Sequence, residues 1–286
     1  MAAKTLMIQG TASTVGKSIL VTALCRIFRQ DGFSVAPFKA QNMTRNSFVI
    51  ESGGEMGGAQ VVQAEAAGIE PSVDMNPILI KPETGNKAQV LVLGKPTMTL
   101  TAGEYGQHAD ELLSVVEKSL ARLCSAYDII VIEGAGSPVE INIKQNEIVN
   151  MRIARLAKAP VLLVGDIDKG GVFASLIGTL TLLDEVERNS IKGLVINKFR
   201  GDIALLQPGL DYLESYTSKP VIGVIPYYQH ILIPEEDSVS EDNEGFSWLS
   251  LPDRQQQYDR LADIVRHSLN LKLVYQILGG SCEFST

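Results

Sequence analysis

The chain has 286 residues, 45% of them hydrophobic and 20% charged, which indicates a folded globular protein with a large core. Its formal net charge of −8 at pH 7 argues against a protein whose main task is to grip nucleic acid, since that task needs a concentrated basic surface. Three scattered cysteines, no signal peptide and no apolar run approaching about twenty residues lead us to expect a soluble cytoplasmic protein.

A phosphate-binding loop is predicted near the start of the chain. An apolar strand over 4–9 leads into a glycine-bounded loop over 10–18, and this loop opens onto a helix predicted over 19–28. In that context backbone N–H groups and the helix dipole face an anion, Lys17 reaches the terminal phosphates, and the Ser18 hydroxyl coordinates Mg²⁺. The loop is one residue longer than the common pattern, and a chance glycine turn before a core helix is the alternative. The predicted ATP contacts here are Gly10, Thr11, Val15, Gly16, Lys17 and Ser18.

A second strand is predicted over 34–39, and the polar stretch 41–47 follows it. Ligands bind where strands end in open parallel sheets, so Lys39 and the following amides are candidates for phosphate or carboxylate contacts. A solvated loop is the alternative on residue types alone. The substrate candidates in this stretch are Gln41, Asn42 and Asn46.

The middle of the chain is less regular. Glycines over 53–58 are interpreted as turn and packing residues, and they lead into a helix over 59–67. Short strand-like pieces follow over 76–82 and 89–93, and the leucine spacing then predicts an amphipathic helix over 104–127.

A buried strand over 128–133 ends in Glu133. A carboxylate that ends a buried parallel strand beside a phosphate loop is the usual means of holding Mg²⁺ or its water. A helix cap or a surface acid is the alternative for this residue. Glu133 is therefore predicted to be both a metal ligand and part of the catalytic set.

Two later strands also end in polar side chains. The strand over 160–166 ends in Asp166 and is followed by Asp168; both touch substrate or metal, or else they cap a helix expected over about 172–188. The strand over 191–198 carries Asn197 at its carboxyl end, where a side-chain amide can read a nucleotide base.

Helices are also expected over 147–158 and 204–216, and a last strand over 220–225. Strands separated by helices throughout predict an α/β fold of the P-loop NTPase type, with a mostly parallel central sheet and helices on both faces. This predicted synthetase domain covers 1–232. An acidic linker over 233–252 precedes a C-terminal part over 253–286, predicted as one amphipathic helix to about 278 and a short tail.

The chain resembles the cobyric acid synthases, the cobalamin-pathway enzymes that amidate side-chain carboxylates of a corrinoid. The resemblance covers residues 4 to about 240 in order, which makes it far more specific than any single motif. The sequence segments on which this resemblance rests include Ala36-Pro-Phe-Lys-Ala-Gln-Asn-Met43, Gly54-Glu-Met-Gly57, Glu133-Gly-Ala-Gly-Ser-Pro138, Val164-Gly-Asp-Ile-Asp168 and Ile196-Asn-Lys-Phe-Arg-Gly-Asp202.

That resemblance implies a reaction in which ATP phosphorylates a carboxylate of adenosylcobyrinic acid a,c-diamide and ammonia displaces phosphate from the acyl phosphate. Lys17, with Mg²⁺ held by Ser18 and Glu133, would neutralise the transferring phosphoryl group, while Lys39 would draw the substrate carboxylate toward it. The expected partners are the corrinoid and a source of ammonia, with no nucleic acid and no membrane; a homodimer is left open.

The sequence departs from the family pattern in two respects. Family members normally continue into a glutaminase domain with a catalytic Cys and His, which we expect to be missing here: His108 and Cys124 lie inside the synthetase portion and Cys282 lies in the tail. Free ammonia or a separate glutaminase subunit is the expected nitrogen source. Thr14 occupies a loop position where many relatives carry an acid, which puts one metal contact in question.

Two other classes of function stay open. One is a dimeric partitioning or septum-site ATPase of the ParA/MinD kind, which acts on DNA or membrane and usually carries an additional lysine early in the loop. Here Thr11, Ala12 and Ser13 follow Gly10. The other is a catalytically silent remnant, which ATP binding with a Lys17→Ala control would distinguish from an enzyme.

Overall fold

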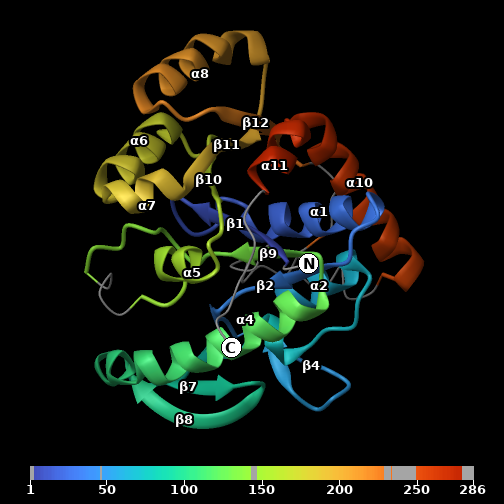
Figure 1. Cartoon of the computed structure of the whole chain (residues 1–286), viewed down its shortest axis with the longest axis vertical. Coiled ribbons are helices and arrows are strands. Elements are labelled where there is room, and N and C mark those ends of the chain that lie inside the picture. The colour runs from blue at the N-terminus through green and yellow to red at the C-terminus, as the bar shows by residue number, and fades with distance from the viewer. Residues whose placement is uncertain (1–2, 46, 143–146, 229–232, 234–248, 279–286) are drawn as a thin grey trace.

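The computed structural model of the chain describes residues 3–45, 47–142, 147–228, 233 and 249–278 (Figure 1). Its centre is a six-stranded sheet in which every paired strand runs parallel to its neighbour. The predicted α/β fold with a parallel central sheet is confirmed. In order across the sheet the strands are β12 (Val221–Pro226), β11 (Ile191–Phe199), β10 (Val161–Asp166), β1 (Lys4–Gly10), β9 (Ile129–Glu133) and β2 (Val35–Phe38).

Helices cover both faces of this sheet, which explains why its strands are nearly continuous apolar runs. Side chains alternate between the two faces: Leu6 and Ile8 of β1 join one core cluster, whereas Met7 between them joins the other. One face carries α1 (Lys17–Gln30), α10 (Leu251–Ser268) and α11 (Leu271–Ile277); the other carries α4 (Ala109–Ala126), α5 (Met151–Leu156), α6 (Val172–Leu182) and α8 (Ile203–Thr217).

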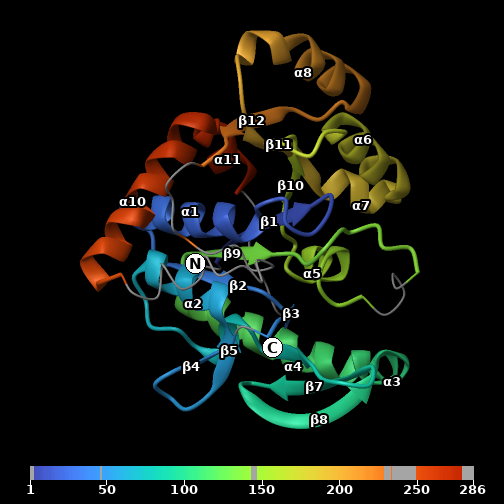
Figure 2. The ribbon, with the colours of Figure 1, turned by 180° about the vertical axis from the view of Figure 1, so that it is seen from behind.

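A smaller, mixed sheet continues from the β2 edge of the molecule (Figure 2). Its strands are β3 (Gln41–Met43), β6 (Ile78–Pro82), β7 (Lys87–Val92) and β8 (Lys95–Thr101), and a separate hairpin is formed by β4 (Ser47–Val49) and β5 (Glu55–Gly57). The expected pieces over 76–82 and 89–93 correspond to β6 and β7, and the expected helix over 59–67 is α2 (Gly58–Ala67). The polar stretch over 41–47 contains strand residues that its composition did not predict, and β8 was not anticipated.

Two helices that the periodicity predicts as single are each broken in two. The stretch over 172–188 divides into α6 and α7 (Glu185–Ser190), because Asp184 starts a new helix with a capping box to Glu187. The C-terminal helix stops at Leu269, which bridges Gly223, and the Asn270 N–H donates to the Ile222 carbonyl at 2.8 Å. In both places a local cap or a strand contact overrides the apolar periodicity.

Helix boundaries also differ elsewhere. The helix predicted over 104–127 begins as α3 (Ala102–Tyr105) and a 3-10 turn (Gly106–His108) before α4, and α5 starts at Met151. A further 3-10 turn, η1 (Val73–Met75), precedes β6.

The C-terminal helices pack on α1, as both views show (Figures 1 and 2). Tyr258 is fully buried and its hydroxyl donates to Glu65 at 2.8 Å, while Arg26 donates to Asp259 at 2.7 Å. Most of the predicted linker, residues 234–248, and the predicted tail from 279 onward lie outside the described residues. Within the described part of the chain, no helix is both long enough and apolar enough to span a bilayer.

Candidate active site

The predicted phosphate loop connects β1 to the first turn of α1. Gly16 precedes the helix with a φ of 94°, and a Cβ there would lie 2.2 Å from the Asn197 amide nitrogen. That same nitrogen donates to the Val15 carbonyl at 2.9 Å. Only glycine fits this position, because a side chain would strain the backbone and push β11 away from the loop. The amide NH₂ of Asn197 thus holds the loop, and the predicted contact of this residue with a nucleotide base stays a prediction.

Lysine side chains surround this loop. Lys198 donates to the Thr14 carbonyl at 2.8 Å, and Lys169 donates to the Thr14 hydroxyl at 2.7 Å. Lys17 donates to the Ala12 carbonyl at 2.9 Å and lies 3.4 Å from the Gly136 carbonyl, which follows β9. Three cations around a loop of backbone amides make a strongly anion-attracting site. Sequence reasoning found Lys17 but assigned no role to Lys169 or Lys198.

Three residues that the sequence places far apart meet at the carboxyl ends of β1, β9 and β2. The Glu133 carboxylate oxygen Oε1 accepts hydrogen bonds from the Ser18 hydroxyl at 2.8 Å and from Lys39 Nζ at 2.9 Å. Glu133 is 1% exposed and Lys39 is 3% exposed. Adjacent parallel strands bring their carboxyl ends to one edge, and β9 lies between β1, which precedes the loop, and β2, which ends just before Lys39.

Gln63 is the residue of this cluster that sequence reasoning missed. It lies on α2, is fully buried, and donates from Nε2 to the second Glu133 oxygen at 2.6 Å. Its own Oε1 has no hydrogen-bond partner among the described residues. In the sequence alone, a glutamine among alanines and valines is easily taken for a surface residue. Gln60 lies one turn earlier on the same face of the helix, and two glutamines at this spacing were a signal that the face is polar and buried.

Asn150 holds the loop after β9 through three hydrogen bonds to its backbone. Asn150 donates to the carbonyls of Ala135 at 2.6 Å and Ser137 at 3.2 Å, and its Oδ1 accepts from the Ala135 N–H at 3.1 Å. This asparagine is 1% exposed. The backbone immediately beyond Glu133 is thus fixed beside the phosphate loop.

The predicted substrate residues lie in different environments. Gln41 accepts a hydrogen bond from the Tyr105 hydroxyl at the edge of the smaller sheet. Asn42 is 2% exposed and donates to Gln60 Oε1 at 3.0 Å, so its side chain lies in the interior of the protein. Asn46 lies outside the described residues.

Asp166 and Asp168 lie at the end of β10, next to β11. Asp166 Oδ1 accepts from the Asp168 N–H at 2.8 Å and its other oxygen is 3.8 Å from Lys198 Nζ, while Asp168 pairs with Arg200 at 2.8 Å. The alternative that these acids cap the following helix is wrong, because Gly171 is the N-cap of α6 and no side chain caps it. Asp166 contacts the same lysine that holds the phosphate loop.

The oxygen donors at Ser18 and Glu133 suit a hard cation such as Mg²⁺. Across the part of the chain that the structure describes, no group of three or more His, Cys, Asp or Glu side chains could hold a metal. Magnesium commonly takes only one or two protein ligands and completes its shell with phosphates and water, so Ser18 and Glu133 stay the predicted candidates for holding it.

The residues matched by family comparison include this whole cluster. Residues 6–239 match the model described as the CobQ/CobB/MinD/ParA nucleotide binding domain. The chain belongs to this family.

Among the curated relatives of this family member is the cobyric acid synthase of Dehalococcoides mccartyi, 63% identical over 240 residues, which are 84% of this chain and 48% of the relative. The cobyric acid synthase of Pelotomaculum thermopropionicum is 62% identical over 240 residues, 83% of this chain and 45% of the relative. The predicted resemblance to cobyric acid synthase is confirmed, and the chain spans about half the length of the curated relatives it matches. The signal recognition particle receptor FtsY of Elizabethkingia anophelis, solved with GDP, is 16% identical with a TM-score of 0.46, covering 78% of this chain and 57% of that chain.

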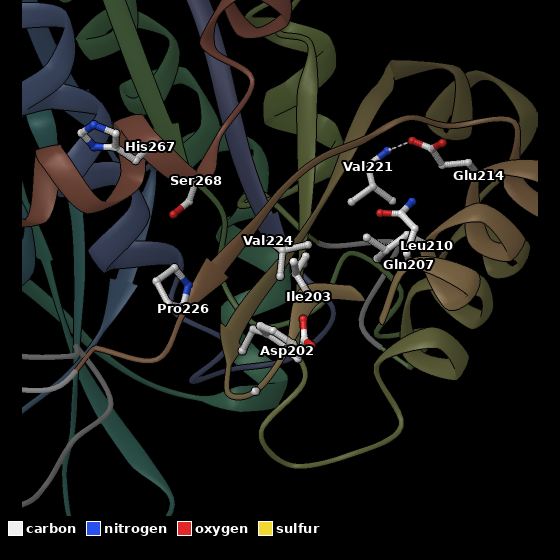
Figure 3. Close-up of a pocket in the computed structure, with 12 residues that line it drawn as sticks. Asp202, Ile203, Gln207, Leu210, Glu214, Val221, Val224, Pro226, His267 and Ser268 are labelled. Carbon is white, nitrogen blue, oxygen red and sulfur yellow. Dashed lines mark hydrogen bonds between the residues drawn. The ribbon is translucent and has the colours of Figure 1, made fainter. Parts of the chain in front are cut away.

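The described residues also line cavities away from the cluster around Glu133. One, of about 680 Å³, lies between β12, α8 and the end of α10, and none of its lining residues belongs to the predicted site (Figure 3). Its polar lining includes Asp202 and Glu214, and Glu214 accepts from the Val221 N–H at 2.7 Å. Another, of about 550 Å³, lies on the smaller sheet, and Gln41 is among its lining residues.

Proposed function

We propose that this chain catalyses the ATP-dependent amidation of corrinoid side-chain carboxylates, from adenosylcobyrinic acid a,c-diamide toward cobyric acid. The observation that carries the proposal is the buried contact of Lys39 and Ser18 with one oxygen of Glu133, beside a lysine-lined phosphate loop. Relatives named cobyric acid synthase at 62–63% identity support the same reaction.

In this proposal the phosphates of ATP lie on the loop amides, with Lys17 at the terminal phosphate. An oxygen of the substrate carboxylate attacks the γ-phosphorus, the bond to the bridging oxygen breaks, and ADP leaves. Ammonia then attacks the acyl carbon, phosphate leaves with the C–O electron pair, and the nitrogen loses a proton. Lys39 holds the substrate carboxylate by charge, and Ser18 with Glu133 would hold Mg²⁺, which when bound neutralises charge on the phosphates.

The scheme needs no side-chain nucleophile. Cys25 on α1 is not suited to act as a nucleophile. Burial, and to a smaller extent the negative charge of Glu133, raises the pKa of its thiol. A thiol whose pKa is raised in this way stays protonated and unreactive near neutral pH.

The ammonia in this proposal comes from outside these 286 residues, either as free ammonium or from a glutaminase. Because the proposed reaction consumes ATP, we expect it to run in the cytoplasm. The retained contacts among Lys39, Glu133 and Ser18 favour an active enzyme over a silent remnant, since a remnant has no need to keep a buried charge pair.

The test is an amidation assay on adenosylcobyrinic acid a,c-diamide with ATP and Mg²⁺, comparing ammonium chloride with glutamine. We expect turnover with ammonium and none with glutamine alone, and no turnover by Lys17→Ala with either. Equal rates with glutamine alone would refute an outside source of ammonia. Absence of turnover with both nitrogen sources would refute the ligase.

A further inference from the structure

Asn76 lies where the central sheet meets the smaller sheet. It ends the 3-10 turn η1, and Pro77 after it disfavours a helical backbone at residue 76 and lacks the N–H group that would extend the turn. Figure 2 shows α2, β2, β3 and β5 grouped where the two sheets meet. The side chain of Asn76 is fully buried there, so the protein itself must supply its hydrogen bonds.

The amide of Asn76 bonds the backbone of three separate stretches of the chain. Its Nδ2 donates to the Lys39 carbonyl and to the Ile78 carbonyl, both at 3.1 Å. Its Oδ1 accepts from the Gly57 N–H at 3.0 Å. Among side chains of this size, only a carboxamide carries two donor hydrogens and an acceptor oxygen on one planar group. The three bonds therefore explain why the residue is an asparagine.

The first of these bonds fixes the backbone of Lys39. This lysine follows the end of β2 and precedes β3, which begins at Gln41. Its N–H donates to the Met75 carbonyl at 2.8 Å and its carbonyl accepts from Asn76, so two consecutive residues hold its backbone. A lysine side chain is long and flexible. Holding its ammonium group 2.9 Å from Glu133 Oε1 therefore requires that the backbone that carries it be fixed.

The bond to Gly57 fixes the start of α2. Gly57 is the N-cap of this helix, and Gln63 on the same helix donates to Glu133 Oε2 at 2.6 Å. Because a helix moves as a unit, an anchor at its first turn also places the side chains that follow. Asn76 thus ties together the backbones that carry Lys39 and Gln63, which contact different oxygens of one carboxylate.

We propose that Asn76 is a positioning residue for the reaction, which sets Lys39 Nζ and Gln63 Nε2 against the two oxygens of Glu133. This inference rests on the proposed function, because that function gives the placement of Lys39 its importance. A displacement of about 1 Å in a site can cost about a hundredfold in rate. Loss of the Asn76 amide is therefore expected to impair the reaction even where the fold persists, whereas a residue that only stabilised η1 would not act on Lys39 selectively.

The direct test is the reactivity of Lys39 toward acetic anhydride, which does not depend on the reaction that the chain catalyses. Lys39 is 3% exposed, and Lys17, 6% exposed in the same site, donates to the Ala12 carbonyl and serves as the internal reference. The folded chain is acetylated, and the modification of each lysine is followed by mass spectrometry of its peptides. We expect Asn76→Ala to speed the acetylation of Lys39 several-fold and to leave that of Lys17 unchanged.

The matched control is Thr5→Val. Thr5 is also fully buried, and its hydroxyl donates to the Ala157 carbonyl at 3.1 Å near the amino end of β1, away from the carboxyl ends of the strands. This variant removes a buried bond to a backbone carbonyl, as Asn76→Ala does. It is expected to change the acetylation of neither Lys39 nor Lys17.

The amidation assay on the same variants connects this placement to the reaction. We expect Asn76→Ala to lower kcat/KM for the corrinoid about tenfold or more at unchanged Kd for ATP, and Thr5→Val to change neither. If Asn76→Ala does not fold, Asn76→Asp takes its place. The aspartate has the same shape and still accepts from the Gly57 N–H, but it lacks the NH₂ group, so the same selective change at Lys39 is expected.

Each result bears on one of the two proposals. Acetylation of Lys39 that stays unchanged, or that rises together with that of Lys17, overturns the inference alone. Unimpaired amidation in a variant whose Lys39 reacts faster also overturns it. If the unaltered chain shows no amidation while Asn76→Ala exposes Lys39 selectively, the proposed function is overturned and the placement of Lys39 by Asn76 stands.

Discussion

Lys39 Nζ lies 2.9 Å from Glu133 Oε1, and their side chains are 4% and 0% exposed. Glu133 ends β9 and Lys39 directly follows β2, the parallel neighbour of β9. Their pairing lies between the predicted phosphate loop, which Ser18 joins to Glu133, and the smaller sheet that begins at Gln41. A buried ion pair contributes little net stability compared with an apolar pair, so its presence favours a chemical role over a structural one.

Removing one member of this pair is predicted to destabilise the fold and to abolish activity. Lys39→Met leaves Glu133 buried without its cation and should lower the free energy of unfolding by about 3 kcal/mol. The double variant Lys39→Met/Glu133→Gln should recover most of that loss yet stay inactive. Urea denaturation and the amidation assay measure both effects, and strictly additive losses in the double variant would mean that the two side chains are not coupled.

Gly16 is predicted to be irreplaceable for a steric reason. In Gly16→Ala the new Cβ would lie 2.2 Å from the Asn197 amide nitrogen, at a φ of 94°, so the loop must shift and ATP binding should weaken more than tenfold. Gly32 is the matched control, since its φ of 91° is similar but a Cβ there meets no atom within 4 Å. Gly32→Ala should cost about 1 kcal/mol of stability and leave Kd for ATP unchanged; equal losses of ATP affinity in both variants would contradict the steric account.

Gln63 is predicted to position Glu133. Gln63→Ala removes the 2.6 Å hydrogen bond to Glu133 Oε2 and should lower kcat while Kd for ATP changes little. Gln60→Ala removes an equally buried glutamine from the same helix that bonds Asn42 instead. Both variants should lose about 1–3 kcal/mol of stability. If kcat falls by the same factor in both, the loss reflects the helix and not the contact with Glu133.

Acid is predicted to loosen the C-terminal helices from α1. The hydrogen bond from Arg26 holds the pKa of Asp259 below its ordinary value of 3.8. A carboxyl group with a lowered folded pKa stabilises the fold above its unfolded pKa, and this stability is lost as the pH falls through the folded pKa. Thermal midpoints should therefore fall as the pH drops below about 4, and Arg26→Met should show a shallower fall in that range. An unchanged slope in Arg26→Met would assign the acid sensitivity to other carboxyl groups.

The sequence predicted those site residues that local patterns mark. Strand, glycine loop and helix identify the region from Gly10 to Ser18, and Glu133 and Lys39 each end an apolar strand, so parallel topology alone brings them to one edge. Gln63 was missed because its role depends on how α2 packs against α1 and β2, which brings it to Glu133 and which no local pattern reports. Lys169 and Lys198 were missed for the same reason, since both hold a loop more than 150 positions earlier in the chain.

The errors in the fold have equally local causes. The periodicity of apolar residues continues across Leu183 and across Leu269, but a capping box in one place and a contact with β12 in the other end the helix. Strand β8 begins Lys95-Pro96 at the edge of its sheet, and its half-exposed side chains give a weak strand signal.

The most direct measurement of the central claim is transfer of oxygen-18 from the substrate carboxylates. Corrinoid labelled with oxygen-18 in its carboxyl groups is incubated with ATP, ammonium and the chain, and the released phosphate is examined by mass spectrometry. If ATP activates a carboxylate beside Lys39 and Glu133, each phosphate released during amidation carries one oxygen-18 atom. Amide formation with unlabelled phosphate would contradict the account, because the carboxylate oxygen would then never have been bonded to phosphorus.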